Sequence, residues 1–160
     1  MLKKHLTNFL IISFLFFVDR ISKIIVLNKT NNFGSSEIYS SEFLNLQLVW
    51  NKGIAFGLLA FNENFAYQII TIIIGIIIVV LFIIMNRSSN KEMSGFVLVI
   101  SGALGNFYDR LFFKAVPDFI DFHYKEFHWF IFNIADIFIS IGIFWLILVE
   151  IFYKKKNEII

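Results

Sequence analysis

A long uncharged segment in the middle of the chain constrains the fold more than any other feature. Residues 64–86 contain no charged side chain, and Ile69–Met85 is almost entirely aliphatic. An α-helix rises about 1.5 Å per residue, so this segment is long enough to cross the roughly 30 Å hydrocarbon core of a bilayer. Of the 160 residues, 58% are hydrophobic and 16% are charged. A water-soluble domain of this size exposes too much surface for that composition, so the sequence predicts an integral membrane protein.

Three other apolar segments also predict membrane helices. We place four spans at about 6–27, 65–86, 94–112 and 130–152. The first span follows Lys3 and Lys4, as a signal peptide would, but no small-residue cleavage site comes after it. We therefore interpret it as an uncleaved membrane helix. Gly102 and Gly105 in the third span favour close helix packing over a direct catalytic role. Residues 1–160 contain no internal repeat or low-complexity linker, which predicts a single membrane-embedded domain.

The distribution of basic residues predicts the orientation. Four spans place both termini on the same side of the membrane, together with Arg87, Lys91 and the basic cluster at 154–156. This excess favours cytoplasmic termini and outward loops at 29–65 and 113–129. Within the first loop, apolar residues alternate along 43–50, a turn follows at 51–53, and a second short strand is expected at 54–56. The predicted fold is therefore an all-α integral membrane protein with four transmembrane helices and a small extracytoplasmic β platform.

Several classes of chemistry lack support in the sequence. The chain has no cysteine, which excludes disulfides and thiolate chemistry, and its net charge of +2 is too small to predict nucleic-acid binding. Its three histidines, His5, His123 and His128, do not form a zinc motif such as H-E-x-x-H. No phosphate-binding glycine loop is present. We therefore expect neither a metal nor a cofactor.

Asp136 lies inside the last apolar segment, where a carboxylate is costly. An ionised Asp near the centre of a bilayer costs roughly 2.5–3.5 kcal/mol even on lenient insertion scales. Asn133 lies three residues earlier on the same helical face. A second carboxylate, Asp118, precedes this span in what we expect to be a short loop. Neither Asp has a cation close by in the sequence, so an acid/base pair at the membrane surface is plausible.

Polar residues on two other spans are expected at the same depth. Asp19 and Lys23 are four residues apart on the first span, and Asn106 comes shortly before Asp109 and Arg110 on the third. With cytoplasmic termini, both groups fall in the outward part of their helices, as does Asn133 with Asp136. Each group also has a simpler interpretation, because Asp19–Lys23 and Asp109–Arg110 could be ion pairs that offset each other's burial.

Five segments together resemble the bacterial lipoprotein signal peptidases, the signal peptidase II family. Residues 19–23 (DRISK) resemble the family's first motif, and residues 51–56 (NKGIAF) are similar to its N-x-G-x-A-F segment. Residues 102–110 (GALGNFYDR) resemble its G-A-x-G-N-x-x-D-R segment. Residues 116–119 (VPDF) and 132–136 (FNIAD) resemble the two segments that carry its catalytic aspartates. The segments come in the family's order, with Ser101 and Pro117 as local departures.

The resemblance implies an aspartic endopeptidase of the bacterial inner membrane. Its substrates would be prolipoproteins that carry diacylglycerol on a cysteine, with cleavage just before that cysteine, and it would contact membrane lipids and act as a monomer. Outward loop 29–65 could close over the substrate. Asp118 and Asp136 would be the catalytic dyad. The residues that bind substrate or support the dyad would be Asn51, Gly53, Asn106, Asp109, Arg110, Asn133, Ala135, Asp19 and Lys23.

Two other classes of function remain to be weighed against a protease. A small transporter or proton-conducting subunit would use Asp136 and Asp109 as relay carboxylates, and it would need polar residues along the whole depth of the bundle. The inner half of the last span, residues 139–149, is almost purely apolar. A structural assembly subunit is the third possibility, but it leaves the cost of Asp136 unexplained.

Overall fold

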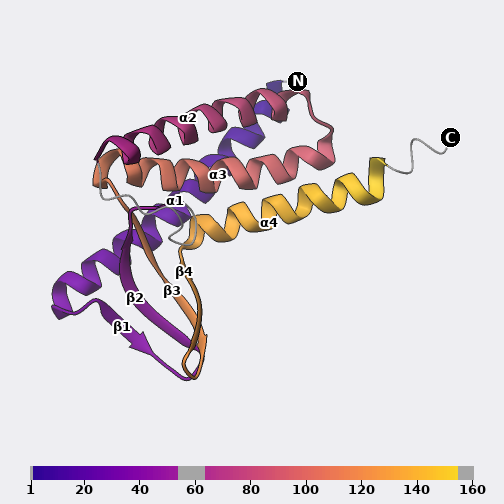
Figure 1. The fold of residues 1–160 in the computed structure, drawn as a ribbon. Helices are drawn as coiled ribbons and strands as arrows, with labels where there is room; N and C mark the ends of the chain where they lie inside the picture. The colour runs from indigo at the N-terminus through magenta and orange to yellow at the C-terminus, as the bar shows by residue number, and fades with distance from the viewer. Residues whose placement is uncertain (1, 54–63, 155–160) are drawn as a thin grey trace.

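A computed structural model describes residues 2–53 and 64–154 of the chain. In this part there are four long helices and a four-stranded sheet (Figure 1). The helices are α1 (Leu2–Phe33), α2 (Asn64–Arg87), α3 (Asn90–Phe113) and α4 (Ile134–Val149), and a π-helical turn, η2 (Glu150–Lys154), continues α4. The strands are β1 (Glu37–Ser40), β2 (Leu44–Asn51), β3 (Val116–Tyr124) and β4 (Phe127–Phe132).

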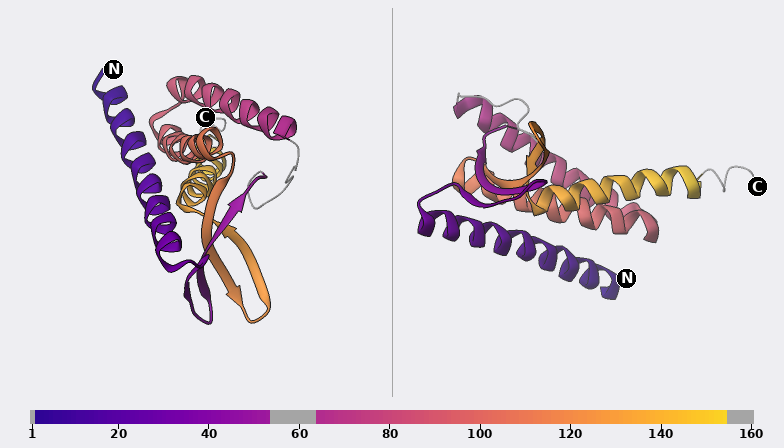
Figure 2. Two further views of the ribbon diagram at one scale, coloured as in Figure 1. Left: turned by 90° about the vertical axis from the view of Figure 1, so that its left-hand side faces the viewer. Right: turned by 90° about the horizontal axis from the view of Figure 1, so that it is seen from below.

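Helix α3 is at the centre of the helical layer and packs against each of the other three helices. Figures 1 and 2 show that the start of α1, the turn between α2 and α3 and the end of α4 lie toward one end of the molecule. The sheet lies toward the opposite end, beside the C-terminal half of α1 and the start of α4. The short α2–α3 turn therefore lies at one end of the molecule. The strands, which come between α1 and α2 and between α3 and α4, lie at the other.

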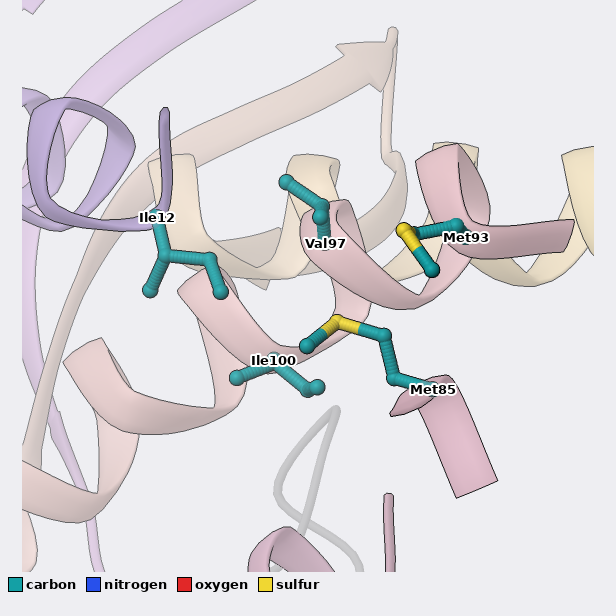
Figure 3. Packing of buried hydrophobic residues seen from close by; sticks show 5 residues of the cluster. All are labelled: Ile12, Met85, Met93, Val97 and Ile100. Atoms are coloured by element: carbon teal, nitrogen blue, oxygen red, sulfur yellow. The ribbon is translucent and has the colours of Figure 1, made fainter. Parts of the chain in front are cut away.

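A cluster of apolar side chains holds α1, α2 and α3 together at the end away from the sheet. Its buried members come from all three helices (Figure 3): Ile12, Met85, Met93, Val97 and Ile100. In a bilayer these side chains would otherwise contact lipid rather than water, so they hold the helices together through close packing rather than through the hydrophobic effect.

Glycines allow α3 and α4 to approach more closely than larger residues would. A Cβ added at Gly95 would lie 3.0 Å from the carbonyl oxygen of Gly142, and one added at Gly102 would collide with the carbonyl oxygen of Ala135. A Cβ at Gly105 would lie 2.5 Å from an oxygen of Asp19 on α1. The predicted packing role of Gly102 and Gly105 is confirmed, and the contact at Gly102 lies just beyond the start of α4.

The strands form one antiparallel sheet in the order β1-β2-β3-β4. The sequence predicted the strand at 43–50, but its neighbours are β1 and β3, which fall in segments expected to be loop. The second strand expected at 54–56 lies outside the described residues, as does that part of loop 29–65. Asp118 was expected in a short loop, and this was wrong. It lies in β3 and is paired with Val49 of β2, because the segment after Lys114 continues the sheet.

Within residues 2–53 and 64–154, three helices are long and apolar enough to cross a membrane: Tyr67–Arg87, Asn90–Phe113 and Ile134–Phe152. They match the second, third and fourth predicted spans. The fourth was predicted to start at about 130, which was wrong by four residues because 127–132 are β4 and Asn133 caps the helix. Helix α1 contains the first predicted span but is not one of the three. Its apolar sequence is interrupted midway by Asp19, Arg20 and Lys23.

Candidate active site

Asp118, the third residue of the inner strand β3, is held by two asparagine side chains. The side chain is nearly inaccessible, at 3% exposure. Asn51, at the end of β2, donates a hydrogen bond to Oδ2 at 2.9 Å, and Asn133 donates to Oδ1 at 2.6 Å. Both oxygens of this carboxylate are thus fixed by neutral donors, and in the described residues no ion pair to Asp118 is formed.

Asp136 lies in the first turn of α4, where the free N–H groups of a helix favour a carboxylate. Asn133 is the N-cap, and the two residues form a reciprocal capping box. The backbone N–H of Asn133 donates to Asp136 Oδ2 at 3.1 Å, and the backbone N–H of Asp136 donates to Asn133 Oδ1 at 3.2 Å. Asn106 of α3 donates to the other oxygen, Oδ1, at 2.8 Å.

Asn133 therefore contacts both carboxylates. Its side-chain N–H₂ donates to Asp118, its side-chain oxygen accepts from the backbone of Asp136, and its own backbone N–H donates to the Asp136 carboxylate. The residue is completely buried. A helix cap and a strand carboxylate are joined through this one amide, which fixes the end of α4 relative to β3.

A buried set of charged side chains on α1 and α3 lies next to the start of α4 and is connected to Asp136 through Asn106. Lys23 is 1% exposed and donates to Asp19 at 3.0 Å, to Asn106 at 3.0 Å and to Asp109 at 2.7 Å. Asn106 in turn donates to Asp136, so Lys23 orients that amide. Asp19 also accepts a hydrogen bond from the backbone N–H of Ala135 at 3.1 Å. The expected Asp19–Lys23 pair is confirmed, and it is connected to the start of α4.

Arg20 was not among the expected site residues, although it lies inside the DRISK segment. It is 9% exposed and forms ion pairs with both Asp19 and Asp109. A charged residue next to Asp19 in an apolar helix was the signal that could have identified it. The expected Asp109–Arg110 pair was wrong, because Asp109 faces α1 and pairs with Arg20 and Lys23 there.

Arg110 instead connects α3 to the end of β2. Its guanidinium donates to the carbonyl oxygen of Asn106 at 3.0 Å and to that of Gly53 at 2.9 Å. The backbone N–H of Gly53 donates to Asn51 Oδ1 at 2.8 Å, which aims the amide of Asn51 at Asp118. Hydrogen bonds therefore connect Arg110 to Asp118 through buried Gly53 and Asn51.

The environment of Asp118 raises its pKa from 3.8 to about 6. Burial is the largest cause, because it penalises the charged carboxylate, and the negative charge of Asp136 acts in the same direction. The hydrogen bonds from Asn51 and Asn133 and the positive charge of Lys23 oppose the shift. A carboxyl group that keeps its proton to near neutral pH beside a second carboxylate can act as an acid while its partner acts as a base.

A cavity of about 530 Å³ opens beside Asp136, between the sheet and α4. It is large enough for a drug-sized apolar ligand. Aromatic and aliphatic side chains dominate its wall, which is lined by Phe122, Trp129, Phe130, Phe132, Asp136, Ile137, Ser140 and Ile141.

The sequence matches a family model described as Signal peptidase (SPase) II over residues 11–152. The chain belongs to the signal peptidase II family. It is 50% identical to the lipoprotein signal peptidase of Pelagibacter ubique (strain HTCC1062) over 98% of this chain and 96% of that one. The lipoprotein signal peptidase of Anaplasma marginale (strain Florida) is 34% identical over 97% of this chain and 90% of the relative.

Solved structures show the same fold. One described as "Bacterial membrane enzyme structure by the in meso method at 2.3 A resolution" has a TM-score of 0.69 and 34% identity, covering 91% of this chain and 87% of the other. The predicted resemblance is thereby confirmed. As a signal peptidase II, the chain is a membrane-bound hydrolase of peptide bonds in the class that processes lipoproteins.

Proposed function

We propose that the chain removes the signal peptide of diacylglyceryl-modified prolipoproteins, with Asp118 and Asp136 as the catalytic dyad. The observation that carries the proposal is the pair of carboxylates, Asp118 buried and Asp136 partly buried, that are joined through Asn133. Family membership supports the substrate class, because the similar proteins are lipoprotein signal peptidases. The cleaved bond would be the one just before the lipidated cysteine.

In this mechanism the two carboxyl groups share one proton. The ionised member accepts a proton from a water molecule while the oxygen of that water attacks the scissile carbonyl carbon. The protonated member donates its proton to the carbonyl oxygen. The resulting tetrahedral diol collapses when the carboxyl group that took the proton from water donates it to the leaving nitrogen. The C–N bond breaks, and the other carboxylate takes back a proton from a diol hydroxyl. The dyad titrates as a unit, so either Asp can hold the proton at rest.

The supporting residues keep this geometry rather than react. Asn51 and Asn133 orient Asp118, and Asn106 orients Asp136 while Lys23 holds Asn106. Asp19 fixes the first turn of α4 through the N–H of Ala135. The apolar cavity beside Asp136 is suited to a hydrophobic segment of the substrate next to the cleaved bond.

The membrane arrangement belongs to the same proposal. Helix α1 crosses the membrane in addition to the other three helices, since its charged residues Asp19, Arg20 and Lys23 are buried against α3 rather than facing lipid. Both termini are in the cytoplasm and the sheet lies at the outer face of the inner membrane. Water then reaches the dyad from outside while the acyl chains of the substrate remain in the bilayer.

A cleavage assay with purified protein and a synthetic lipidated precursor peptide tests the dyad. Asp118→Asn and Asp136→Asn should each lower the rate by at least about 100-fold, the scale of a lost general acid or base. Both variants should still elute as folded protein in detergent. Exposed Glu126, in the turn between β3 and β4, supplies the matched control, and Glu126→Gln should cleave at the normal rate.

The masses of the products locate the cleaved bond. A lipid-bearing product that begins with the modified cysteine supports the proposed site of cleavage. Near-normal turnover by either Asp→Asn variant would rule out the dyad, and a product that begins elsewhere would rule out the proposed specificity.

A further inference from the structure

A second group of titratable side chains lies on the sheet, apart from the dyad. Asp121 and His123 are two residues apart on β3 and so share one face of the strand. His128 of β4 is the direct cross-strand partner of His123, and the two rings stack with centroids 4.9 Å apart. One potential ligand atom from each of the three residues lies within 4.8 Å of the others.

Two buried polar atoms of this group have no hydrogen-bond partner among the described residues. Asp121 is fully buried, and its Oδ2 accepts from Asn45 at 3.3 Å and from Gln47 at 3.1 Å, and lies 2.9 Å from His128 Nδ1. Among the described residues, Oδ1 of the same carboxylate has no hydrogen-bond partner, and neither does the buried Nδ1 of His123. A buried polar group without a hydrogen-bond partner is destabilising, so two of them in one place require an explanation.

An ion pair between Asp121 and His128 is the simplest interpretation of the cluster. It uses Oδ2 of the carboxylate and leaves both unsatisfied atoms as they are. A carboxylate oxygen and a neutral imidazole nitrogen are both electron-pair donors, so a cation bound by this group would give such atoms a partner. Two imidazoles with one carboxylate are a ligand set that suits zinc and neighbouring transition metals.

We propose that Asp121, His123 and His128 bind one divalent transition-metal ion, for which zinc is the appropriate probe. Ligand atoms on a tetrahedral zinc lie about 3.3 Å apart, given bonds of about 2.0–2.2 Å. The group, whose atoms are at most 4.8 Å apart, needs only a modest contraction. The side chain of His128 is half-exposed, which gives the ion a route from solvent and leaves a fourth position for water.

This site is separate from the dyad. Asp118 and Asp121 are three residues apart on the same strand, so their side chains point to opposite faces of the sheet. Bound metal would instead connect β3 to β4 and, through Asn45 and Gln47, to β2. Its expected effect is to stabilise the sheet. The histidines lack a linear zinc motif because strand pairing, rather than sequence spacing, brings them together.

Equilibrium dialysis with elemental analysis tests the site directly. Full-length protein without a histidine tag, treated with a chelator and purified in detergent, should bind one Zn²⁺ per chain and show a higher Tm when zinc is restored. Bound Co²⁺ should give the visible absorption of a low-symmetry site. His123→Ala, His128→Ala and Asp121→Asn should each lose the bound ion and the zinc-dependent rise in Tm.

His5 on α1 provides the matched control, because it is the remaining histidine of the chain and lies outside the cluster. His5→Ala should bind zinc as the unmodified protein does. The exposed position of His128 makes its variant the least disruptive to folding, and gel filtration with the metal-free Tm checks this. Absence of zinc binding by the unmodified protein would overturn the proposal, as would full binding by folded His128→Ala.

Discussion

At the scale of single residues, the amide of Asn133 determines how the two carboxylates meet. It contacts Asp118 through its side chain and Asp136 through both its side chain and its backbone. Asn51 supplies the other donor to Asp118. Hydrogen bonds from neutral donors favour the charged form of a carboxylate, so these amides limit how far burial can raise the pKa of Asp118.

The pH dependence of cleavage follows from the raised pKa of Asp118, about 6. The protonated form exists below that pKa, so the dyad loses its shared proton as the pH rises through it and the rate should fall on the alkaline side. Asn51→Ala removes a donor that favours the carboxylate, which raises the pKa further. The alkaline limb of kcat/KM should therefore move to higher pH in that variant.

Asn45→Ala is the control for this experiment, because Asn45 lies on the same strand but bonds to Asp121. Its alkaline limb should stay where it is in the unmodified protein. A limb that moves to lower pH in Asn51→Ala, or that moves equally in both variants, would show that Asn51 does not set the proton affinity of the dyad.

Sequence spacing predicted the local contacts of the site and missed the distant ones. The contact between Asn133 and Asp136 follows from a three-residue spacing at a helix start, and the pair Asp19–Lys23 follows from a four-residue spacing. The partner of Asp109 comes from another helix, so no spacing within α3 could supply it. The sequence suggested Asp118 as a partner of Asp136, and the family resemblance made it the expected second member of the dyad. Spacing does not predict its contact with Asn133 of the next element.

At the scale of elements, the packing of α3 against α4 positions Asp136, which accepts a hydrogen bond from Asn106 of α3. The hydropathy of the chain predicted α2 almost to the residue, because a continuous aliphatic segment can be little else. It did not predict β3, since Pro117, Asp118 and Asp121 break the apolar alternation that marks a strand, and it assigned part of β4 to the fourth span. Asp118 and Asp121 are buried and hydrogen-bonded to side chains of β2, which is why the strand that carries them does not have an ordinary pattern.

Gly102→Ala should weaken this packing. The added Cβ would collide with the carbonyl oxygen of Ala135 and lie 2.8 Å from Ile139, and a backbone carbonyl cannot rotate away. Overpacking of this kind typically costs about 1–3 kcal/mol, and α4 must shift together with Asp136. We expect a lower Tm in detergent and slower cleavage of the lipidated peptide.

Gly75→Ala on α2 is the matched substitution. Its Cβ would approach only the ring of Phe107, at 3.2 Å, and a side chain can move where a backbone cannot. Its Tm and cleavage rate should stay close to those of the unmodified protein. Equal behaviour of the two variants would contradict the proposed role of Gly102 in placing α4.

At the scale of the whole molecule, the proposed site lies where the helices meet the sheet, at one end of the bundle (Figure 2). The start of α1 and the turn before α3 lie at the other end, with exposed Lys3, Lys4, Arg87 and Lys91. These basic residues are the basis for the proposed cytoplasmic termini and outward-facing dyad. The proposed arrangement requires α1 to cross the membrane with Asp19 and Lys23 buried against α3.

Single cysteines test this arrangement without background, because the chain has no cysteine of its own. Exposed positions at the two ends of the molecule are Lys3 and Asn90 at one end and Lys29 and Glu126 at the other. Each is replaced by cysteine in turn, and intact cells are treated with a membrane-impermeant maleimide before and after permeabilisation. Retained cleavage of a lipoprotein precursor confirms that each variant is folded.

Lys29→Cys and Glu126→Cys should react in intact cells, whereas Lys3→Cys and Asn90→Cys should react only after permeabilisation. The comparison of Lys3→Cys with Lys29→Cys is the decisive one, because these positions lie at opposite ends of α1. Labelling of both from outside, or of neither, would mean that α1 does not cross the bilayer. Labelling of Asn90→Cys in intact cells with protection of Glu126→Cys would place the dyad at the cytoplasmic face, where the lipidated precursor would have to be cleaved from inside.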